Sequence, residues 1–361
     1  MPKQTVCILC GGRSSEHEVS LQSALNVTAA LDREAYKVLL VGIARDGGWQ
    51  LYRDGPFAIH TDDPARTALA DGGELVVPLA LDGGMCLMAV ASGERLPVDV
   101  VFPVLHGTFG EDGAVQGLLR MFHVPCVGCD VASSANCMDK DLAKRLMDAA
   151  EIPNARFVMI RSGDDWDADE IAGRLGLPAF VKPASQGSSV GVSKAKSIPE
   201  LAEAIRLAMR YDTKVLVEEA VAGREIEVAV LGNHEPRASL PGEVIPKHEF
   251  YSYDAKYLDE DGAVLIAPAE LDPVLTACIQ AEALRVFRAL GCSGMARVDF
   301  FLKTDSTLLV NELNTIPGFT RISMYPKLWE ASGIRYPMLV DRLLQLALEQ
   351  YADRQQNRTT R

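Results

Sequence analysis

Apolar runs of strand length alternate with helical patterns in the first third of the chain. The run "VCILCGG" ends in a glycine turn, and "EVSLQSALNVTAALD" follows it with helical periodicity. "YKVLLVGIA" and "VDVVFPVLH" are further apolar runs, of the kind that a parallel sheet buries on both faces. The alternation predicts a doubly wound α/β domain over residues 1–127, with its functional groups at the carboxyl ends of strands.

Glu16 and His106 both follow the ends of such runs. This position makes Glu16 a candidate site residue. A single histidine after a strand is as readily structural as functional, so both interpretations of His106 stay open at this point.

The pattern changes from residue 128 onward. "MDKDLAKRLMDAAEIP" predicts an amphipathic helix with Leu142, Leu146 and Ala150 on its buried stripe and Pro153 beyond its end. This helix and the elements after it predict an α+β domain over residues 128–220.

Short strand candidates, "PAFVKP" and "SVGVSKA", follow this helix. Ser197 stands three residues before Glu200, which predicts a capping box at the start of another helix. "KVLVEEAV" and "EIEVAVLG" are further strands, and after about Ala220 the sequence predicts an antiparallel sheet with covering helices. Residues 221–361 therefore form a third predicted domain, also α+β.

Charge and hydropathy narrow the class of protein. The 361 residues carry a net charge of −13, and Lys and Arg form no cluster, which argues against a nucleic-acid partner. It does not argue against ATP, because a few lysines and a metal can hold phosphates on an acidic protein. No apolar run approaches the ~20 residues that span a bilayer, and the N-terminus lacks a signal-peptide core. We therefore expect no membrane association and a cytoplasmic protein.

The eight cysteines include two Cys-x-x-Cys pairs, Cys7/Cys10 and Cys126/Cys129. In a strand, a three-residue offset puts Cys7 and Cys10 on opposite faces. The two pairs are also much farther apart than the roughly 15–20 residues of a zinc ribbon. Buried reduced thiols are therefore expected rather than a zinc site.

"VKPASQGSSVG", residues 181–191, is rich in Gly and Ser between two strand candidates. Such a segment suits a phosphate, and it suits a flexible hairpin tip equally well. It is not a Walker A loop, because Lys182 precedes the glycines. "CGGRSS" does not fit G-x-G-x-x-G either, which disfavours a Rossmann oxidoreductase.

"ARVDFFLK" and "TLLVNELN" predict a β-hairpin with a two-residue turn at 305–306. This turn places Asp299 opposite Glu312 and Arg297 opposite Asn314, all on one face. Opposed carboxylates repel, and Mg²⁺ compensates them well because it prefers a few carboxylate or amide oxygens plus substrate phosphates. The alternative is a solvated polar face with Arg297 as counter-ion.

Lys140, Lys182 and Lys256 each lie beside strand-end or turn signals. Together with a metal-binding hairpin and a Gly/Ser loop, they are the components of a phosphoryl-transfer site.

Eight motifs occur in an order and spacing that resemble one known family: "GGRSSEHEVSL", "LHGTFGEDGAVQG", "MDK", "VKPASQGSSVGVSK", "GREIEVAVLGN", "YDAKY", "MARVDF" and "NELNTIPGFT". The chain resembles the D-alanine–D-alanine ligases of the ATP-grasp superfamily over residues 5 to 345. The resemblance implies an ATP-grasp fold, in which the two α+β domains sandwich ATP.

The resemblance implies an ATP site and a metal site. Its ATP-binding residues are Lys140, Lys182, Ser185, Ser188, Ser189, Glu218, Glu219, Val221, Glu225, Lys256, Asn311 and Glu312. Its ligands for two Mg²⁺ ions, or for Mn²⁺ in their place, are Asp299, Glu312 and Asn314.

The resemblance also implies the substrate contacts. Glu16 anchors the ammonium of the first D-alanine in a triad with Ser188 and Tyr257. The other implied contacts are His106 beside the first substrate, Arg297 and the Gly318 backbone N–H as the oxyanion hole, and Ser323 and Met324 at the second substrate.

The implied activity joins two D-alanines through a D-alanyl phosphate, with ATP converted to ADP and phosphate, for peptidoglycan precursor synthesis. "YDAKY" favours D-alanine as second substrate, and the resemblance implies a homodimer. Two alternatives stay open: another ATP-grasp carboxylate–amine ligase, and a nucleotide-binding sensor without turnover.

Overall fold

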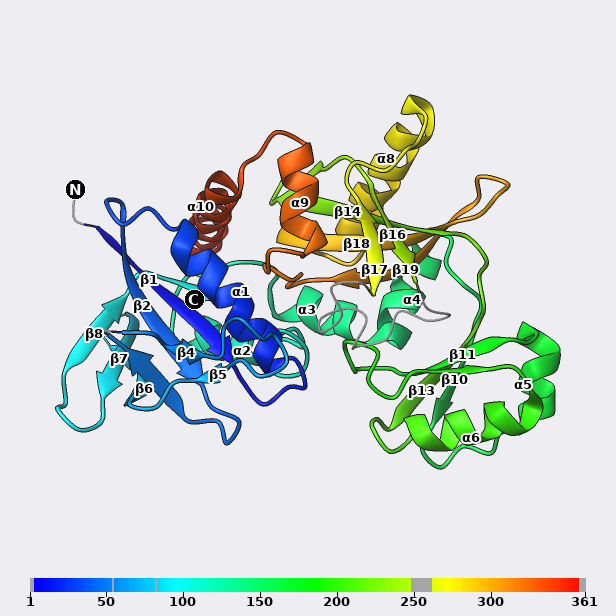
Figure 1. Cartoon of the computed structure of the whole chain (residues 1–361), viewed down its shortest axis with the longest axis horizontal. Helices are drawn as coiled ribbons and strands as arrows, with labels where there is room; N and C mark the ends of the chain where they lie inside the picture. Colours follow the sequence, from blue (N-terminus) through cyan, green and yellow to red (C-terminus); the bar gives the residue numbers. More distant parts are fainter. Residues whose placement is uncertain (1–2, 54, 82, 248–261, 357–361) are drawn as a thin grey trace.

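The computed structural model describes residues 3–53, 55–81, 83–247 and 262–356. Three large β-sheets with their own helices and one small two-stranded sheet make up this described part of the chain (Figure 1). The sheet of the N-terminal region lies to the left in this view, and the other two sheets lie to the right.

The N-terminal sheet has seven strands in the order β8-β7-β6-β3-β2-β1-β9. Parallel pairing joins β1 (Gln4–Gly11) to β2 (Tyr36–Ile43) on one side and to β9 (Val100–Pro103) on the other. The runs expected to form parallel strands are confirmed, and the remaining strands of this sheet, for which the sequence analysis named no element, pair antiparallel. These strands are β3 (Trp49–Tyr52), β6 (Glu74–Leu81), β7 (Gly84–Ala89) and β8 (Arg95–Val98), and β4 (Ala58–Ile59) and β5 (Ala68–Leu69) form a separate pair.

Helices cover both faces of the parallel part of this sheet, as predicted. Cys10 faces the core shared with α1 (His17–Ala30) and the C-terminal helix α10 (Tyr336–Gln355), whereas Cys7 faces the core shared with α2 (Ala114–Met121). The two thiols therefore point to opposite faces, which confirms the prediction. All eight cysteines are free thiols.

The second sheet is antiparallel, with the order β10-β13-β11-β12. Its strands are β10 (Phe157–Arg161), β11 (Ala179–Pro183), β12 (Ser193–Ala195) and β13 (Lys214–Glu219), and α5 (Ala168–Leu175) and α6 (Ile198–Ala208) pack on it. The Ser197 hydroxyl accepts from the backbone N–H of Glu200, which confirms Ser197 as the N-cap of α6. The reciprocal half of the predicted capping box differs, because the Glu200 carboxylate accepts from the backbone N–H of Lys196 and from the Ser197 hydroxyl.

The third sheet is also antiparallel, with the order β17-β16-β14-β18-β19. Its strands are β14 (Arg224–Gly232), β16 (Gly242–Pro246), β17 (Ala263–Ile266), β18 (Gly294–Leu302) and β19 (Leu308–Asn314), with β15 (Arg237–Ala238) beside β14. Helix α8 (Pro273–Ala289) packs on one face, and α9 (Met324–Ala331) shares the core on the other.

The helices α3 (Val131–Met138) and α4 (Lys140–Ala149) pack against this third sheet rather than the second. The predicted stripe of α4 is wrong at Leu142, which is 41% exposed. The buried face carries Ala143, Met147 and the charged Lys144. A hydrophobic pattern misses this face because a lysine is seldom buried without a partner.

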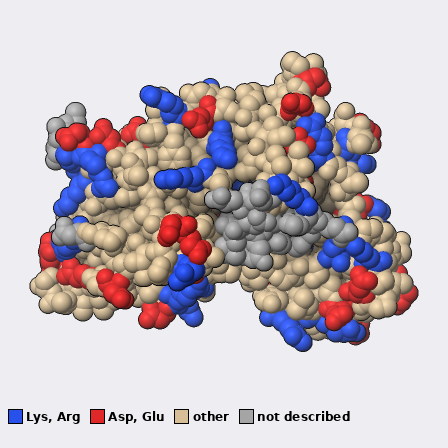
Figure 2. Space-filling view, in the orientation of Figure 1, with Lys and Arg blue, Asp and Glu red and all other residues tan. Residues whose placement is uncertain are grey.

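Among the described residues, no helix combines the length and the apolar character needed to cross a membrane. On the face shown in Figure 2, Lys and Arg alternate with Asp and Glu over the described residues and make no continuous basic surface.

Candidate active site

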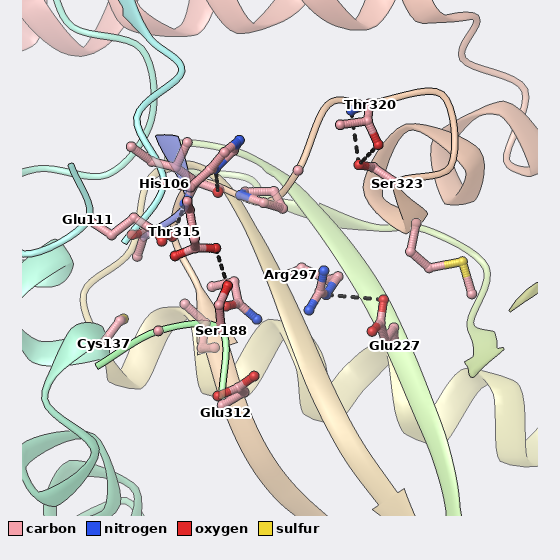
Figure 3. Close-up of a pocket in the computed structure, with 18 of the residues that line it drawn as sticks. His106, Glu111, Cys137, Ser188, Glu227, Arg297, Glu312, Thr315, Thr320 and Ser323 are labelled. Atoms are coloured by element: carbon pink, nitrogen blue, oxygen red, sulfur yellow. Dashed lines mark hydrogen bonds and ion pairs between the residues drawn. The ribbon is translucent and has the colours of Figure 1, made fainter. Parts of the chain in front are cut away.

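A cavity of about 300 Å³ lies between the N-terminal region, the connection between β11 and β12, and the third sheet (Figure 3). We call that connection, residues 184–192, the serine loop. The predicted site residues that line the cavity are Glu16, His106, Lys140, Ser188, Arg297, Glu312, Asn314, Gly318, Ser323 and Met324.

Other predicted residues do not line this cavity: Lys182, Ser185, Ser189, Glu218, Glu219, Val221, Glu225, Asp299 and Asn311. Lys256 and Tyr257, and with them the predicted third member of the triad, lie outside the described residues.

The β18–β19 hairpin forms one wall, and its pairing at the site is as predicted. Asp299 lies opposite Glu312, and Arg297 lies opposite Asn314. The strand on the other side of β18 places Glu227 opposite Asp299 as well. Three acidic residues therefore form a row across β14, β18 and β19, and the sequence analysis did not single out Glu227.

The predicted two-residue turn of this hairpin is wrong. Pairing ends at Leu302 with Leu308, and the backbone N–H of Lys303 donates to the carbonyl of Thr307 over 2.9 Å. The register shifts between Asp299 and Phe300, which leaves Asn311 as an extra residue in β19. Such a β-bulge re-aims side chains, and here it restores the pairing at the site.

Arg297 is held by acidic partners. Its Nε and Nη2 donate to the two oxygens of Asp299, each over 2.7 Å, and Nε lies 3.1 Å from Oε2 of Glu227 (Figure 3). The Asn314 amide also donates to Asp299, over 3.0 Å. A two-point Arg–carboxylate contact fixes the plane of the guanidinium, so Arg297 enters the cavity in a defined orientation.

The donor set of the hairpin fits Mg²⁺. Asp299 and Glu312 supply carboxylates from paired positions, and Asn314 supplies an amide oxygen. No group of three or more His, Cys, Asp or Glu side chains suited to a metal occurs in the described part of the chain. Mg²⁺ does not need one, since it usually takes one or two carboxylates and completes its shell with waters and phosphates. A carboxylate has about four acceptor positions, so the bonds to Arg297 do not exclude ligation by Asp299.

Glu16 and Ser188 meet across the cavity. The Ser188 hydroxyl donates to Oε1 of Glu16, a contact predicted from the resemblance. Glu16 is 4% exposed, and the backbone leaves little room around it. A Cβ on Gly107 would lie 2.5 Å from Oε2 of Glu16, and one on Gly187 would lie 2.9 Å from the same atom. Glycine at both positions therefore lets the carboxylate fit.

The serine loop is anchored at its base and turned sharply at its tip. Lys140 Nζ donates to the carbonyl of Gln186 over 2.7 Å, and the backbone N–H of Ser185 donates to Asp212 over 2.7 Å. Ser188 and Ser189 have φ of 49° and 60°. Left-handed backbone is sparsely populated by residues with a Cβ, and such strain is typical of loops that clamp a ligand.

His106 is 4% exposed and is bonded through both ring nitrogens. Its Nδ1 lies 2.9 Å from the carbonyl of Ile316, and its Nε2 lies 3.0 Å from the Ser23 hydroxyl. Burial lowers the pKa of His106. The ring therefore holds the 316–319 segment next to the cavity.

A chain of charges behind the cavity links the second sheet to α4. Glu218 contacts Lys182 at 2.7 Å and Lys144 at 3.3 Å. Burial alone would raise the pKa of Glu218, but the two lysines outweigh it and lower the pKa to about 2. Lys182 also donates to Asn311 over 3.4 Å, so the bulge residue of the hairpin joins this chain.

The remaining predicted nucleotide residues lie around the β13–β14 connection. The Glu219 carboxylate accepts from the backbone and Nε of Arg156, over 2.9 and 2.7 Å. Val221 lies in the connection itself, and Glu225 lies in β14, opposite Phe301.

Ser323, Met324 and Gly318 close the other end of the cavity. Ser323 Oγ accepts from the backbone N–H of Thr320 over 2.9 Å, and Met324 is buried. A Cβ on Gly318 would lie 2.6 Å from Ser323 Oγ, so glycine keeps this corner open.

The sequence analysis missed Glu111, which lines the cavity within the quoted motif "LHGTFGEDGAVQG". Burial and the nearby Glu16 carboxylate together raise the pKa of Glu111 to about 8, against the opposing effect of the backbone amides of Gly107 and Ile316. The sequence held one signal that could have found Glu111: the adjacent acids Glu111 and Asp112 follow two glycines shortly after the end of a strand.

Two family models match the sequence. The first, described as D-ala D-ala ligase N-terminus, matches residues 5–129, and the second, described as D-ala D-ala ligase C-terminus, matches residues 146–345. The chain belongs to the D-alanine–D-alanine ligase family.

Similar proteins span the whole chain of this family member. D-alanine–D-alanine ligase A of Chromobacterium violaceum is 52% identical over 355 residues, which cover 97% of this chain and 96% of the relative. The D-alanine-D-alanine ligase structure from Coxiella burnetii has a TM-score of 0.86 at 38% identity and covers 99% and 97% of the two chains. The ligase from Bacillus anthracis complexed with ATP has a TM-score of 0.73 at 25% identity and covers 97% and 99%.

Proposed function

We propose that the protein is a D-alanine–D-alanine ligase that joins two D-alanines at the cost of one ATP and supplies the dipeptide for peptidoglycan precursor synthesis. The observation that carries the proposal is the meeting of Glu16 and Ser188 in the same cavity as Arg297 and Glu312. Glu16, which would bind the substrate ammonium, and the hairpin face with Arg297 and Glu312 thereby line one cavity. They are close enough to act on one small amino acid.

In the first step, Glu16 binds the ammonium of one D-alanine, and the carboxylate oxygen of this substrate attacks the γ-phosphorus of ATP. A D-alanyl phosphate forms and ADP leaves. Lys140 and Lys182 hold the phosphates, and the serine loop excludes water that would hydrolyse the acyl phosphate. Asp299, Glu312 and Asn314 would hold Mg²⁺, which neutralises charge on the phosphates when bound.

In the second step, the neutral amine of the other D-alanine attacks the acyl carbonyl, and phosphate leaves once the tetrahedral intermediate collapses. Arg297 and the Gly318 N–H stabilise the oxyanion, and one such donor is worth about 3–4 kcal/mol. Ser323 orients the carboxylate of the second substrate, and Met324 lines its pocket.

In the ATP site, Glu218 and the backbone near Val221 bind the adenine. The other residues around the nucleotide are Ser185, Ser189, Glu219, Glu225, Lys256 and Asn311. A homodimer in the cytoplasm is part of this proposal.

Phosphate release from Mg²⁺-ATP tests the proposal. We expect release with D-alanine and none above background with L-alanine. Turnover with L-amino acids but not with D-alanine would identify another carboxylate–amine ligase. ATP binding without phosphate release in the presence of any D-amino acid would identify a sensor.

A further inference from the structure

Glu111 joins two segments that are far apart in the sequence. Its Oε2 accepts from the backbone N–H of Gly107 over 2.7 Å, and its Oε1 accepts from the backbone N–H of Ile316 over 3.0 Å. Glu111 and Ile316 are 205 positions apart. One carboxylate therefore spans the boundary between the N-terminal region and the segment that follows β19.

Side chains of the N-terminal region make most of the hydrogen bonds to the 316–319 segment, and the Tyr336 hydroxyl of α10 adds one to the carbonyl of Phe319 over 2.9 Å. Glu111 binds the N–H of Ile316 and His106 binds its carbonyl, so this peptide group is fixed from both sides. Three residues on, the backbone N–H of Phe319 donates to the Ser23 hydroxyl over 3.2 Å. Gly318 lies between these two anchors, and its own N–H is therefore aimed by contacts outside its own sheet.

The Gly107 end of the same carboxylate supports Glu16. Because a Cβ on Gly107 would already collide with Oε2 of Glu16, the backbone of Gly107 is the surface against which that carboxylate rests. Holding the Gly107 N–H with Glu111 keeps this surface in place. One oxygen of Glu111 thus fixes the support of Glu16, and the other fixes the segment that carries Gly318, and both Glu16 and Gly318 line the cavity.

We propose that Glu111 is a positioning residue that sets the distance between the ammonium anchor Glu16 and the oxyanion donor at Gly318. The proposal rests on the proposed function. The ionised form suits this role because it accepts on both oxygens, and the two backbone N–H bonds favour that form. An amide would place a donor NH₂ against one of the two N–H groups.

The test is Glu111→Gln, with Asp112→Asn as matched control. Asp112 is the adjacent acid, and it too accepts two backbone N–H bonds, from Phe109 over 2.8 Å and Ala114 over 3.0 Å. Both of its bonds lie within the local turn, and Asp112 does not line the cavity. The two variants therefore make the same chemical change, but only one of them affects the long-range connection.

For Glu111→Gln we expect kcat to fall about 10- to 100-fold, because a displacement of about 1 Å can cost 10²-fold. The KM for the first D-alanine rises as well, while the KM for ATP stays within about twofold of wild type. Asp112→Asn keeps all three constants within about twofold. Glu111→Asp keeps both acceptor oxygens on a shorter side chain and should give an intermediate loss of kcat. This variant replaces Glu111→Gln in the test if the Gln variant does not fold.

Amide hydrogen exchange supplies a readout that does not depend on activity. In Glu111→Gln, the amides of Ile316, Gly318 and Phe319 exchange faster than in wild type while those of β18 and β19 keep their protection, and Asp112→Asn changes neither set. Unchanged exchange at 316–319, or equal losses of kcat in the two acid variants, overturns the positioning role. Absence of D-alanine turnover in the wild type with the expected exchange pattern overturns the proposed function alone.

Discussion

The β18–β19 hairpin and the contact between Glu111 and Ile316 serve one cavity but are built differently. In the hairpin, strand pairing sets Asp299 opposite Glu312, so both side chains are placed by local backbone pairing. At the other wall, Glu111 meets a backbone amide 205 positions away, and only the docking of two regions brings them together. The hairpin wall carries charged side chains, whereas the contact between Glu111 and Ile316 fixes the position of a distant backbone segment.

This difference gives an expectation about mutations. Changes on the hairpin face should lower turnover while the strand pairing is kept, because that pairing does not depend on those side chains. Changes at the docked wall should alter substrate binding and local order together. The predictions below test each side of this comparison.

Glu312→Gln is expected to have the largest effect. Removal of one of the carboxylates proposed to hold Mg²⁺ should cost several kcal/mol in the transition state, so kcat falls by about 10⁴-fold. Steady-state phosphate release measures it. Asp305→Asn, in the exposed turn of the same hairpin, is the control and should keep wild-type turnover. Full activity of Glu312→Gln would remove the metal role from the hairpin.

Arg297→Met removes the positive charge from the same hairpin wall. The loss of an oxyanion donor predicts a fall in kcat of about 10²- to 10³-fold. The unfolding free energy should fall as well, by about 3 kcal/mol, because the buried Asp299 and Glu227 lose their cation, so turnover is compared per folded protein. A large loss of stability with normal turnover in the surviving folded protein would show that Arg297 only neutralises Asp299 and Glu227.

Glu218→Gln tests the charge chain that connects the hairpin to the second sheet. It leaves the buried Lys144 without its carboxylate, and breaking such a pair costs about 3 kcal/mol of unfolding free energy. Because the folded pKa of about 2 lies below the ordinary value of 4.5, this stabilisation is complete above pH 4.5 and is lost as the pH falls toward 2.

Denaturant unfolding of wild type and Glu218→Gln between pH 7 and pH 3 measures this prediction. The stability difference between them should shrink as the solution becomes more acidic. A difference that stays constant across this range, or grows toward acid pH, would contradict the ionised state of Glu218.

The two walls also differ in what the sequence could predict. Period-two alternation was sufficient to put Asp299 and Glu312 on one face. Their pairing was correct although the predicted turn was wrong, because the bulge at Asn311 offsets the longer turn. Glu111 and Ser23 could not be placed in this way, since their partners come from a distant segment and no local period encodes docking.

Helix α4 shows a second limit of pattern analysis. Its predicted stripe included Leu142, which is exposed, while Lys144 is buried beside Glu218. Hydrophobic periodicity assumes that charged residues face water. Lys144 can be buried because Glu218 of β13 pairs with it, and only the folded structure brings these two residues together.

Ser23→Ala is expected to have the smallest effect, and it probes the docked wall without removing a charge. The Ser23 hydroxyl accepts from Phe319 and contacts His106, so its loss leaves a buried N–H unsatisfied at a cost of about 1 kcal/mol. We expect the KM for D-alanine to rise about fivefold, equivalent to that energy, with the KM for ATP unchanged. Ser134→Ala is the matched control, since Ser134 is equally buried but its hydroxyl has no hydrogen-bond partner among the described residues. Equal effects of the two substitutions would show that the docked wall tolerates loss of the Ser23 contact, and the positioning of Gly318 would then depend on the remaining contacts of Ile316 and Phe319.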